Sequence, residues 1–262
     1  MQFSYVQIGA RDYKSLALFY KDALEFTPCD DYRWLRGNDG EVLCAPGYEA
    51  NAPVFGFIKA NEGACRKIND TGFAHICFET DNVNKAVKHF IECGGSFVST
   101  LRHPNINPCV YCKDPEGNIV EFHVPFGAGI KTVGSLLQLR PYKGLRFIHV
   151  NLITDNWEKL CEFYKDKFGC TDTGDIKDHS GTYKSKVIGI EGVHVVGRHI
   201  LLPGFYETYP TLEIFTYNIK GAQSPQSESE LGINCIGFSS ASDSENFHLI
   251  KDSQNAPILI AD

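Results

Sequence analysis

The sequence predicts an α+β fold built from a repeated unit in which a strand and a helix are followed by three more strands. Two segments, residues 5–22 and 149–166, align without gaps, and in each a Phe lies fourteen residues after the first position. Residues 75–82 match the second of them at a Thr-Asp-Asn step, and a weaker copy begins at residue 233. Each copy opens with a short run rich in Val, Ile and Phe and continues with apolar residues at helical spacing.

The helices are predicted from apolar residues three and four positions apart, which would form one buried face. Asp81 or Asn82, and Asp155 or Asn156, are suited to capping the second and third helices, and Gly169 stands where the third should stop. The apolar positions are Leu16, Phe19, Tyr20 and Ala23 in the first helix, Val83, Ala86, Val87 and Phe90 in the second, and Trp157, Leu160, Cys161 and Tyr164 in the third.

Strand-like runs follow each helix. The Asp-Pro-Glu-Gly-Asn turn within residues 113–118 predicts a hairpin, because Asp, Pro, Gly and Asn favour tight turns. The runs are residues 53–58 in the first unit, 110–112 and 119–124 in the second, and 186–190, 193–196, 199–202 and 211–217 in the third.

The fourth unit is expected to be cut short. Its sequence provides a first strand, a helix around residues 247–250 and one strand at residues 257–260, so the last two strands of a full unit are predicted to be missing. A sheet edge left open in this way can pair with another chain. A homodimer that covers the edge is therefore one prediction.

Composition excludes several classes of function. The chain has 262 residues, a net charge of -7 and no basic face, so a nucleic-acid partner is not expected. No apolar run reaches the length of a membrane span, and no signal peptide is indicated. Ten cysteines stand mostly in apolar stretches, which favours free thiols in a reducing cytoplasm. Cys109 and Cys112 form one C-x-x-C, either a metal or redox pair or two residues of a strand.

The hairpin segment, residues 113–124, and the runs of residues 186–204 and 211–217 resemble the vicinal oxygen chelate superfamily. This superfamily holds glyoxalase I, extradiol dioxygenases and bleomycin-resistance proteins. The resemblance covers nearly the whole chain, and it implies that the units pair into open, cupped mixed sheets.

The resemblance also implies metal ligands at the start of the first strand and in the last strand of a unit. Carried over by position, these are His75 and Glu121 in the second unit and His149 and Glu213 in the third. Both Glu residues alternate with apolar neighbours, and they are the predicted catalytic residues. His and Glu together suit a divalent Zn, Ni, Fe or Mn ion with positions open to substrate. The alternative is that each His is merely hydrogen-bonded and each Glu merely solvated.

The other two units depart from the ligand pattern. Tyr5 stands in place of the His and Gly56 in place of the Glu in the first unit, and Cys235 replaces the His in the fourth, where the Glu-bearing strand is expected to be absent. Tyr5 is predicted to line the first cup. His123 shares the strand face of Glu121 and is predicted to line the substrate site beside it.

Pairing of the units decides which ligands meet. The arrangement expected by default pairs the first unit with the second and the third with the fourth, giving glyoxalase-like domains at residues 1–130 and 145–262. Each cup would then hold half a ligand set. In the alternative, the second unit pairs with the third, and all four of His75, Glu121, His149 and Glu213 converge.

The function that follows from the resemblance is that of a metal-dependent lyase or isomerase acting on a small substrate with vicinal oxygens. Two alternatives stay open. One is a metal-free protein of the bleomycin-resistance type that binds a small ligand, and the other is an oxidoreductase that resembles extradiol dioxygenases. The sequence carries no phosphate-binding glycine loop and no nucleophile-elbow motif.

Overall fold

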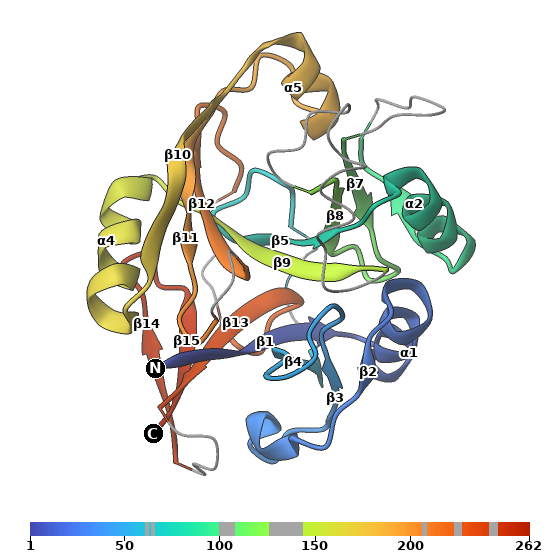
Figure 1. Cartoon of the computed structure of the whole chain (residues 1–262), viewed down its shortest axis with the longest axis vertical. Helices are drawn as coiled ribbons and strands as arrows, with labels where there is room; N and C mark the ends of the chain where they lie inside the picture. Colours follow the sequence, from blue (N-terminus) through green and yellow to red (C-terminus); the bar gives the residue numbers. More distant parts are fainter. Residues whose placement is uncertain are drawn as a thin grey trace.

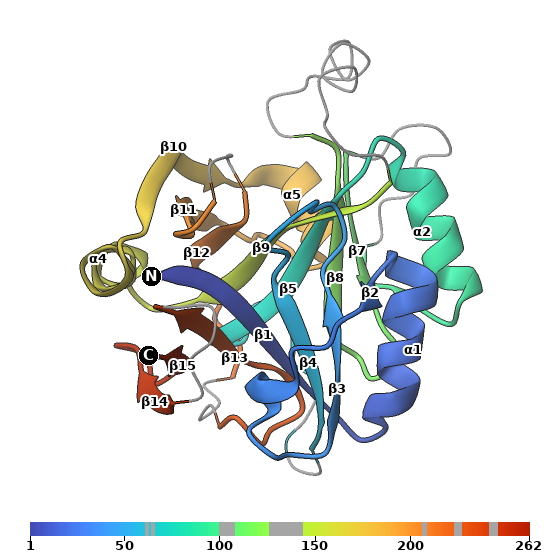
Figure 2. The same cartoon turned by 60° about the horizontal axis from the view of Figure 1, so that its bottom comes forward.

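The computed structural model describes residues 1–60, 63, 66–99, 108–125, 144–205, 209–222, 227–240 and 246–262. Its strands form one seven-stranded and one eight-stranded mixed sheet, as expected for an α+β fold of repeated units (Figures 1 and 2). Among these residues, no helix is both long enough and apolar enough to cross a membrane.

The first two units contain the predicted helices and strands. The first comprises β1 (Gln2–Ala10), α1 (Tyr13–Leu24), β2 (Thr27–Pro28), the short 3-10 helix η1 (Tyr32–Leu35), β3 (Gly40–Cys44) and β4 (Val54–Lys59). The second comprises β5 (Gly72–Glu79), α2 (Val83–Glu92), β6 (Ser96–Phe97), β7 (Cys109–Lys113) and β8 (Ile119–His123).

The last two units contain more departures from the prediction. The third comprises β9 (Arg146–Ile153), α4 (Trp157–Phe168), β10 (Thr171–His179), α5 (Gly181–Ile188), β11 (Val195–Leu201) and β12 (Thr211–Tyr217). The fourth comprises β13 (Gly232–Ser239), β14 (Phe247–Lys251) and β15 (Pro257–Ala261).

The predicted caps are confirmed: Asn82 and Asn156 accept the backbone N–H of Lys85 and Lys159, and Gly169 ends α4 at a φ of 75°.

The sheets show which units pair. The strand orders are β14-β15-β13-β1-β4-β3-β2 and β10-β11-β12-β9-β5-β8-β7-β6. Within each unit the first strand runs parallel to the last, and two units join through their first strands, β1 with β13 and β5 with β9, both antiparallel. The second unit therefore shares a sheet with the third, and the first shares a sheet with the fourth.

The default pairing of first with second and third with fourth is thus wrong. The observed pairing has a physical reason. The antiparallel register of β5 with β9 places Ile76 opposite Val150, and both side chains enter one apolar core. The domain boundary predicted near residue 130 lies outside the described residues. The position of that boundary, between residues 1–130 and 145–262, stays a prediction.

The first unit contacts the second through a helix and a turn instead. The hydroxyl of Tyr20 in α1 donates to Asp114 Oδ2 in the β7–β8 turn at 3.1 Å, and the hydroxyl of Tyr164 in α4 donates to Asp252 Oδ2 in the β14–β15 turn at 3.1 Å. In both turns the other oxygen of the Asp accepts backbone N–H groups. The repeat seen in the sequence therefore extends to the contacts between units.

The fourth unit is truncated in a different place from the one predicted. Residues 247–250 belong to a strand, β14, and β15 runs parallel to β13, in the position held by the last strand of every other unit. The part of the unit that the structure describes contains no helix and no partner strand outside β14. The expected helix is wrong because Phe247 to Lys251 pair along their length with β15, while β14 becomes the edge of the seven-stranded sheet.

The third unit differs from the prediction at residues 186–202. Residues 186–188 end helix α5 rather than starting a strand, the runs around 193–196 and 199–202 merge into the single strand β11, and β10 was not predicted. Short apolar runs fit a strand or a buried helix equally well. Here Val187 and Ile188 pack into the core beside Val195, and Gly189 ends the helix at a φ of 79°.

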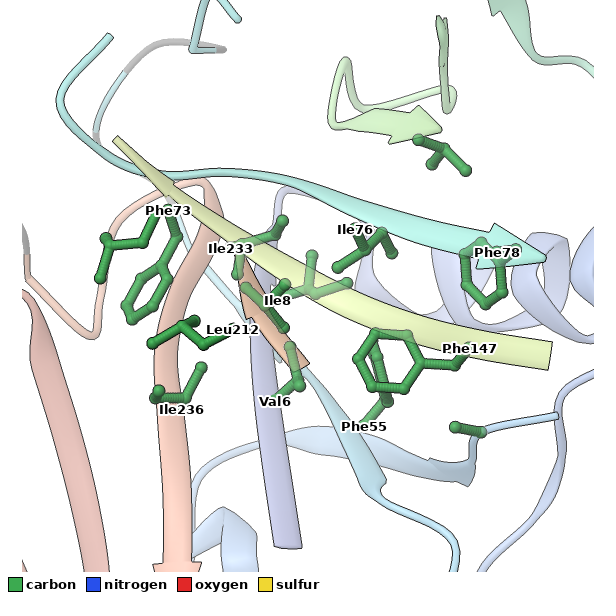
Figure 3. Packing of buried hydrophobic residues seen from close by; sticks show 14 of the residues in the cluster. Val6, Ile8, Phe55, Phe73, Ile76, Phe78, Phe147, Leu212, Ile233 and Ile236 are labelled. Atoms are coloured by element: carbon green, nitrogen blue, oxygen red, sulfur yellow. The ribbon is translucent and has the colours of Figure 1, made fainter. Parts of the chain in front are cut away.

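The two sheets pack against each other through their inner faces. Figure 3 shows Ile76 and Phe78 of β5 and Phe147 of β9 opposite Val6 of β1 and Phe55 of β4. Because side chains alternate along a strand, the neighbours of these residues point to the outer face of each sheet. The outer face of the eight-stranded sheet carries α5 (Figure 1), and that of the seven-stranded sheet is covered by η1.

Candidate metal centre

Four adjacent strands at the centre of the eight-stranded sheet carry the predicted ligands. In the order β12-β9-β5-β8 they present Glu213, His149, His75 and Glu121, each from the outer face. Val120 and Phe122, which flank Glu121, lie in the inner core, so the alternation predicted from the sequence is confirmed. All four ligand candidates are buried, with exposed fractions from 0% to 7%.

The four side chains converge on one point. One ligand atom from each residue lies within 4.8 Å of all the others. His75 Nε2 is 3.0 Å from Glu121 Oε2 and 3.3 Å from Glu213 Oε2. His149 Nε2 is 3.3 Å from Glu121 Oε2 and 3.5 Å from Glu213 Oε2, and the two Nε2 atoms are 3.3 Å apart. The alternative pairing left open by the sequence is the one that produces this cluster.

The electrostatics of the cluster favour a bound cation. Burial alone would lower the pKa of His75, but its hydrogen bonds to Glu121 and Glu213 raise that pKa to about 9. Burial would raise the pKa of both Glu residues, yet the adjacent imidazoles hold it well below its usual range. Burial lowers the pKa of His149, against the attraction of Glu213. Two ionised carboxylates thus share one buried pocket with a single favoured positive charge.

The donor set fits a divalent transition metal. Imidazole nitrogen and carboxylate oxygen suit Zn, Ni, Fe and Mn, and two carboxylates with two neutral imidazoles balance the charge of a divalent ion. His75 directs its Nε2 atom at the cluster. Its Nδ1 atom is buried and has no hydrogen-bond partner among the described residues. A metal held here would displace the proton favoured on His75, so binding would release protons.

Polar residues around the cluster orient Glu213. The Asn151 amide donates to Glu213 Oε2 at 2.8 Å, and His199 Nε2 lies 3.2 Å from Glu213 Oε1. His199 Nδ1 is 3.0 Å from the Thr211 hydroxyl. Both oxygens of Glu213 are therefore engaged. Groups of this kind fix the orientation of a metal ligand and tune its basicity.

Glu121 has a different set of neighbours. The Cys109 thiol donates to Glu121 Oε1 at 2.8 Å, and the ring of Tyr111 lies edge-on to that of His75. Cys112 is fully buried and packs in the inner core, so the two cysteines of the C-x-x-C point to opposite faces of β7. The interpretation as two residues of a strand is confirmed. The nine described cysteines are all free thiols.

A cavity of about 480 Å³ opens over the cluster. Glu121 and Glu213 line it, and His123 lines it at the end of β8, on the face predicted for it. The remaining lining comes from β7, β10, β11, helix α5 and the residues beside them: Pro108, Cys109, Tyr111, Lys177, Asp178, His179, Ser180, Tyr183, Lys184, Val187 and His199.

The seven-stranded sheet has no comparable centre at the equivalent positions. Tyr5 and Cys235 occupy the positions of the two His residues there, and Gly56 and Leu259 those of the two Glu residues. Tyr5 is fully buried, stacks on Trp34 with ring centroids 4.9 Å apart, and donates a hydrogen bond to Gln7. Tyr5 therefore lies in a packed core, away from the cavity over the four-residue cluster.

The expectation that the fourth unit lacks the strand for a Glu is also wrong. That strand is present as β15, but it carries Leu259 at the position in question. Both Cys235 and Leu259 are fully buried in the apolar cluster around Trp34. A chelating set is excluded at these positions by residue type rather than by a missing strand.

Sequence reasoning missed several residues of the site. His199, Cys109 and Asn151 were not singled out as partners of the Glu residues, and Lys177 and Lys184 were not noticed at all. His199 reaches the site because it lies directly opposite Glu213 in the antiparallel β11–β12 pair, and that register could not be predicted from the sequence. The lysines gave no signal, because their approach to the site depends on how β10 and α5 fold over the sheet.

Comparisons with known proteins agree with the fold. The model of the Glyoxalase/Bleomycin resistance protein/Dioxygenase superfamily matches residues 2–122. No curated protein matches the chain significantly. Glyoxalase I from Zea mays is 11% identical with a TM-score of 0.59, covering 100% of this chain and 92% of its own, and a mutant of it is 13% identical with a TM-score of 0.60 and the same coverage.

A third solved structure is similar over the whole chain. A protein from Bacillus subtilis, proposed to be a dioxygenase, is 12% identical with a TM-score of 0.58 and covers 100% of this chain and 84% of its own. At such low identity these likenesses establish the shared fold and leave the reaction open.

Proposed function

Since the chain belongs to the Glyoxalase/Bleomycin resistance protein/Dioxygenase superfamily, we propose that it is a metal-dependent lyase or isomerase acting on a small substrate with vicinal oxygens. One observation carries the proposal. His75, Glu121, His149 and Glu213 come from two different units, yet their ligand atoms lie within 4.8 Å of one another beneath a cavity.

The roles of the residues follow from their contacts. A divalent metal held by the four side chains would act as a Lewis acid toward two neighbouring oxygens of the substrate. Glu121 and Glu213 both line the cavity, and we expect one of them to take a proton from a carbon next to those oxygens. His199, within 3.2 Å of Glu213 Oε1, offers that proton a further acceptor.

The test is metal content measured by plasma mass spectrometry. The protein would be purified without a His tag and loaded with Zn, Ni, Mn or Fe. We expect one ion per chain in the native protein and in His248→Ala, a control on exposed β14, and none in His75→Ala or His149→Ala. Loss of metal in only one of the two cluster variants would contradict a shared centre. No metal under any loading would favour the metal-free binding protein.

A dioxygenase is the second candidate. Two His residues and one carboxylate with open positions are the ligand set of many non-haem iron oxygenases, and this cluster contains that set together with a second carboxylate. Oxygen consumption by the Fe(II)-loaded protein in the presence of catechol separates the candidates. Uptake that is lost in His149→Ala would favour the dioxygenase, and no uptake would favour the lyase or isomerase.

A further inference from the structure

One wall of the cavity carries basic side chains that the cluster does not use. Lys177 and His179 come from the end of β10, and Lys184 comes from the first half of α5. All three are half-buried and line the cavity. In this part of the chain β10 is followed directly by α5 (Figure 1).

The charges of the two lysines are not neutralised within the described residues. Neither Lys177 nor Lys184 forms a salt bridge there, while the acidic neighbour Asp178 is exposed and pairs with His194 at 2.7 Å. Burial lowers the pKa of His179, and the positive charge of Lys184 lowers it further. The field of Lys184 thus acts inside the cavity.

The rest of the cavity lining has a different character. Pro108, Cys109 and Tyr111 supply uncharged surface, and the two cluster carboxylates in the lining, Glu121 and Glu213, are each engaged by both imidazoles. Ser180, which caps α5 without a side-chain hydrogen bond, adds the positive end of a helix to the basic wall. Lys177 and Lys184 therefore remain as cations of the lining whose charge the cluster does not use.

We propose that the cavity takes an anionic substrate, whose carboxylate or phosphate group is held by Lys177 and Lys184 while its vicinal oxygens face the four-residue cluster. This inference rests on the proposed function and adds the class of substrate. The volume of about 480 Å³ is within the range of about 300–1,000 Å³ typical of small-molecule sites. A half-buried ammonium interacts with an anion more strongly than a solvated one, since water screens it less.

The test compares two probes that differ by one anionic group. Catechol and 3,4-dihydroxybenzoate both carry vicinal oxygens, and only the second carries a carboxylate. Their affinities for the zinc-loaded protein would be measured by titration calorimetry. We expect 3,4-dihydroxybenzoate to bind at least tenfold more tightly than catechol. In a Lys177→Ala/Lys184→Ala variant this preference should fall below twofold, while the affinity for catechol stays unchanged.

Two controls keep the comparison sharp. Lys186→Ala removes an exposed lysine from the same helix that does not line the cavity, so it should keep the full preference. If the double alanine variant unfolds at a lower temperature than the native protein, Lys177→Gln/Lys184→Gln removes the charges while keeping longer polar side chains. Competition with acetate and with inorganic phosphate then distinguishes a carboxylate from a phosphate as the anion.

The outcomes separate this inference from the function on which it rests. Equal binding of both probes to the native protein, or a preference that survives the lysine substitutions, would overturn the anionic substrate and leave the metal centre standing. Lysine-dependent binding of 3,4-dihydroxybenzoate that is unaffected by His75→Ala would support the anion site and remove the vicinal-oxygen role of the cluster.

Discussion

Asn151 and His199 hold the carboxylate of Glu213 in one orientation. The Asn151 amide, 2.8 Å from Glu213 Oε2, holds the carboxylate that faces both imidazoles. We expect Asn151→Ala to weaken metal binding by roughly 10–100-fold, the usual cost of removing a partner of a metal ligand. Competition with a chelator measures the affinity. Gln7→Ala, the equivalent position in the other sheet, should destabilise the protein without changing its affinity for metal. Unchanged affinity in Asn151→Ala would contradict the orienting role.

Gly56 leaves the space that the side chain of Tyr5 occupies. A Cβ at this position would lie 2.0 Å from the hydroxyl of Tyr5, which is itself fixed against Trp34. Gly56→Ala should therefore cost about 1–3 kcal/mol of unfolding free energy, as overpacking of a core does. Adding Tyr5→Phe removes the closest atom and should recover part of the loss, which urea unfolding of the single and double variants would measure. Additive effects would exclude this contact as the cause.

The β7–β8 turn introduces a pH-dependent contribution to stability. Burial raises the pKa of Asp114 from 3.8 to about 6, against the hydrogen bonds from Asn118 and Tyr20. The folded protein thus holds the proton to a higher pH than the unfolded chain. The stabilisation is full below about pH 4 and is lost as the pH rises through about 6.

Asp114→Asn tests this contribution. Between pH 4 and pH 7 the native protein should lose about 2–3 kcal/mol more unfolding free energy than the variant, since one pKa unit corresponds to about 1.4 kcal/mol. The variant will be less stable overall, because an amide cannot accept every hydrogen bond that the carboxylate receives. The comparison therefore concerns the change with pH, measured by urea unfolding. Parallel pH profiles for the two proteins would refute the assignment.

At the level of the whole chain, a metal would link units that are far apart in sequence. Its ligands come from the second and third units, so binding favours the folded chain only when β5 and β9 are paired. At a free metal concentration 100 times the dissociation constant the gain is about 2.7 kcal/mol. For a chain of this length that raises Tm by roughly 5–10 °C. Thermal unfolding with and without EDTA should show this shift in the native protein and none in His149→Ala.

The repeated unit was predictable because each helix and strand carries its own local signal. Apolar residues at helical spacing predicted α1, α2 and α4, and Asn82 and Asn156 predicted where two of them begin. The prediction failed where a short apolar run is compatible with both a helix and a strand. Val187 and Ile188 lie in a helix that buries them beside Val195, and Phe247 lies in a strand because β15 pairs with it.

By itself the sequence determined the repeated unit and the strand face on which Glu121 and Glu213 lie, since side-chain alternation is a local property. Its resemblance to the superfamily supplied the four ligand candidates. Only the tertiary structure decided that the four meet. His75 and His149 are 74 positions apart, and their approach depends on the antiparallel register of β5 with β9. It also decided that Lys177 and Lys184 face the same cavity. Contacts between distant segments depend on how apolar faces of several elements share one core, and no local pattern encodes that choice.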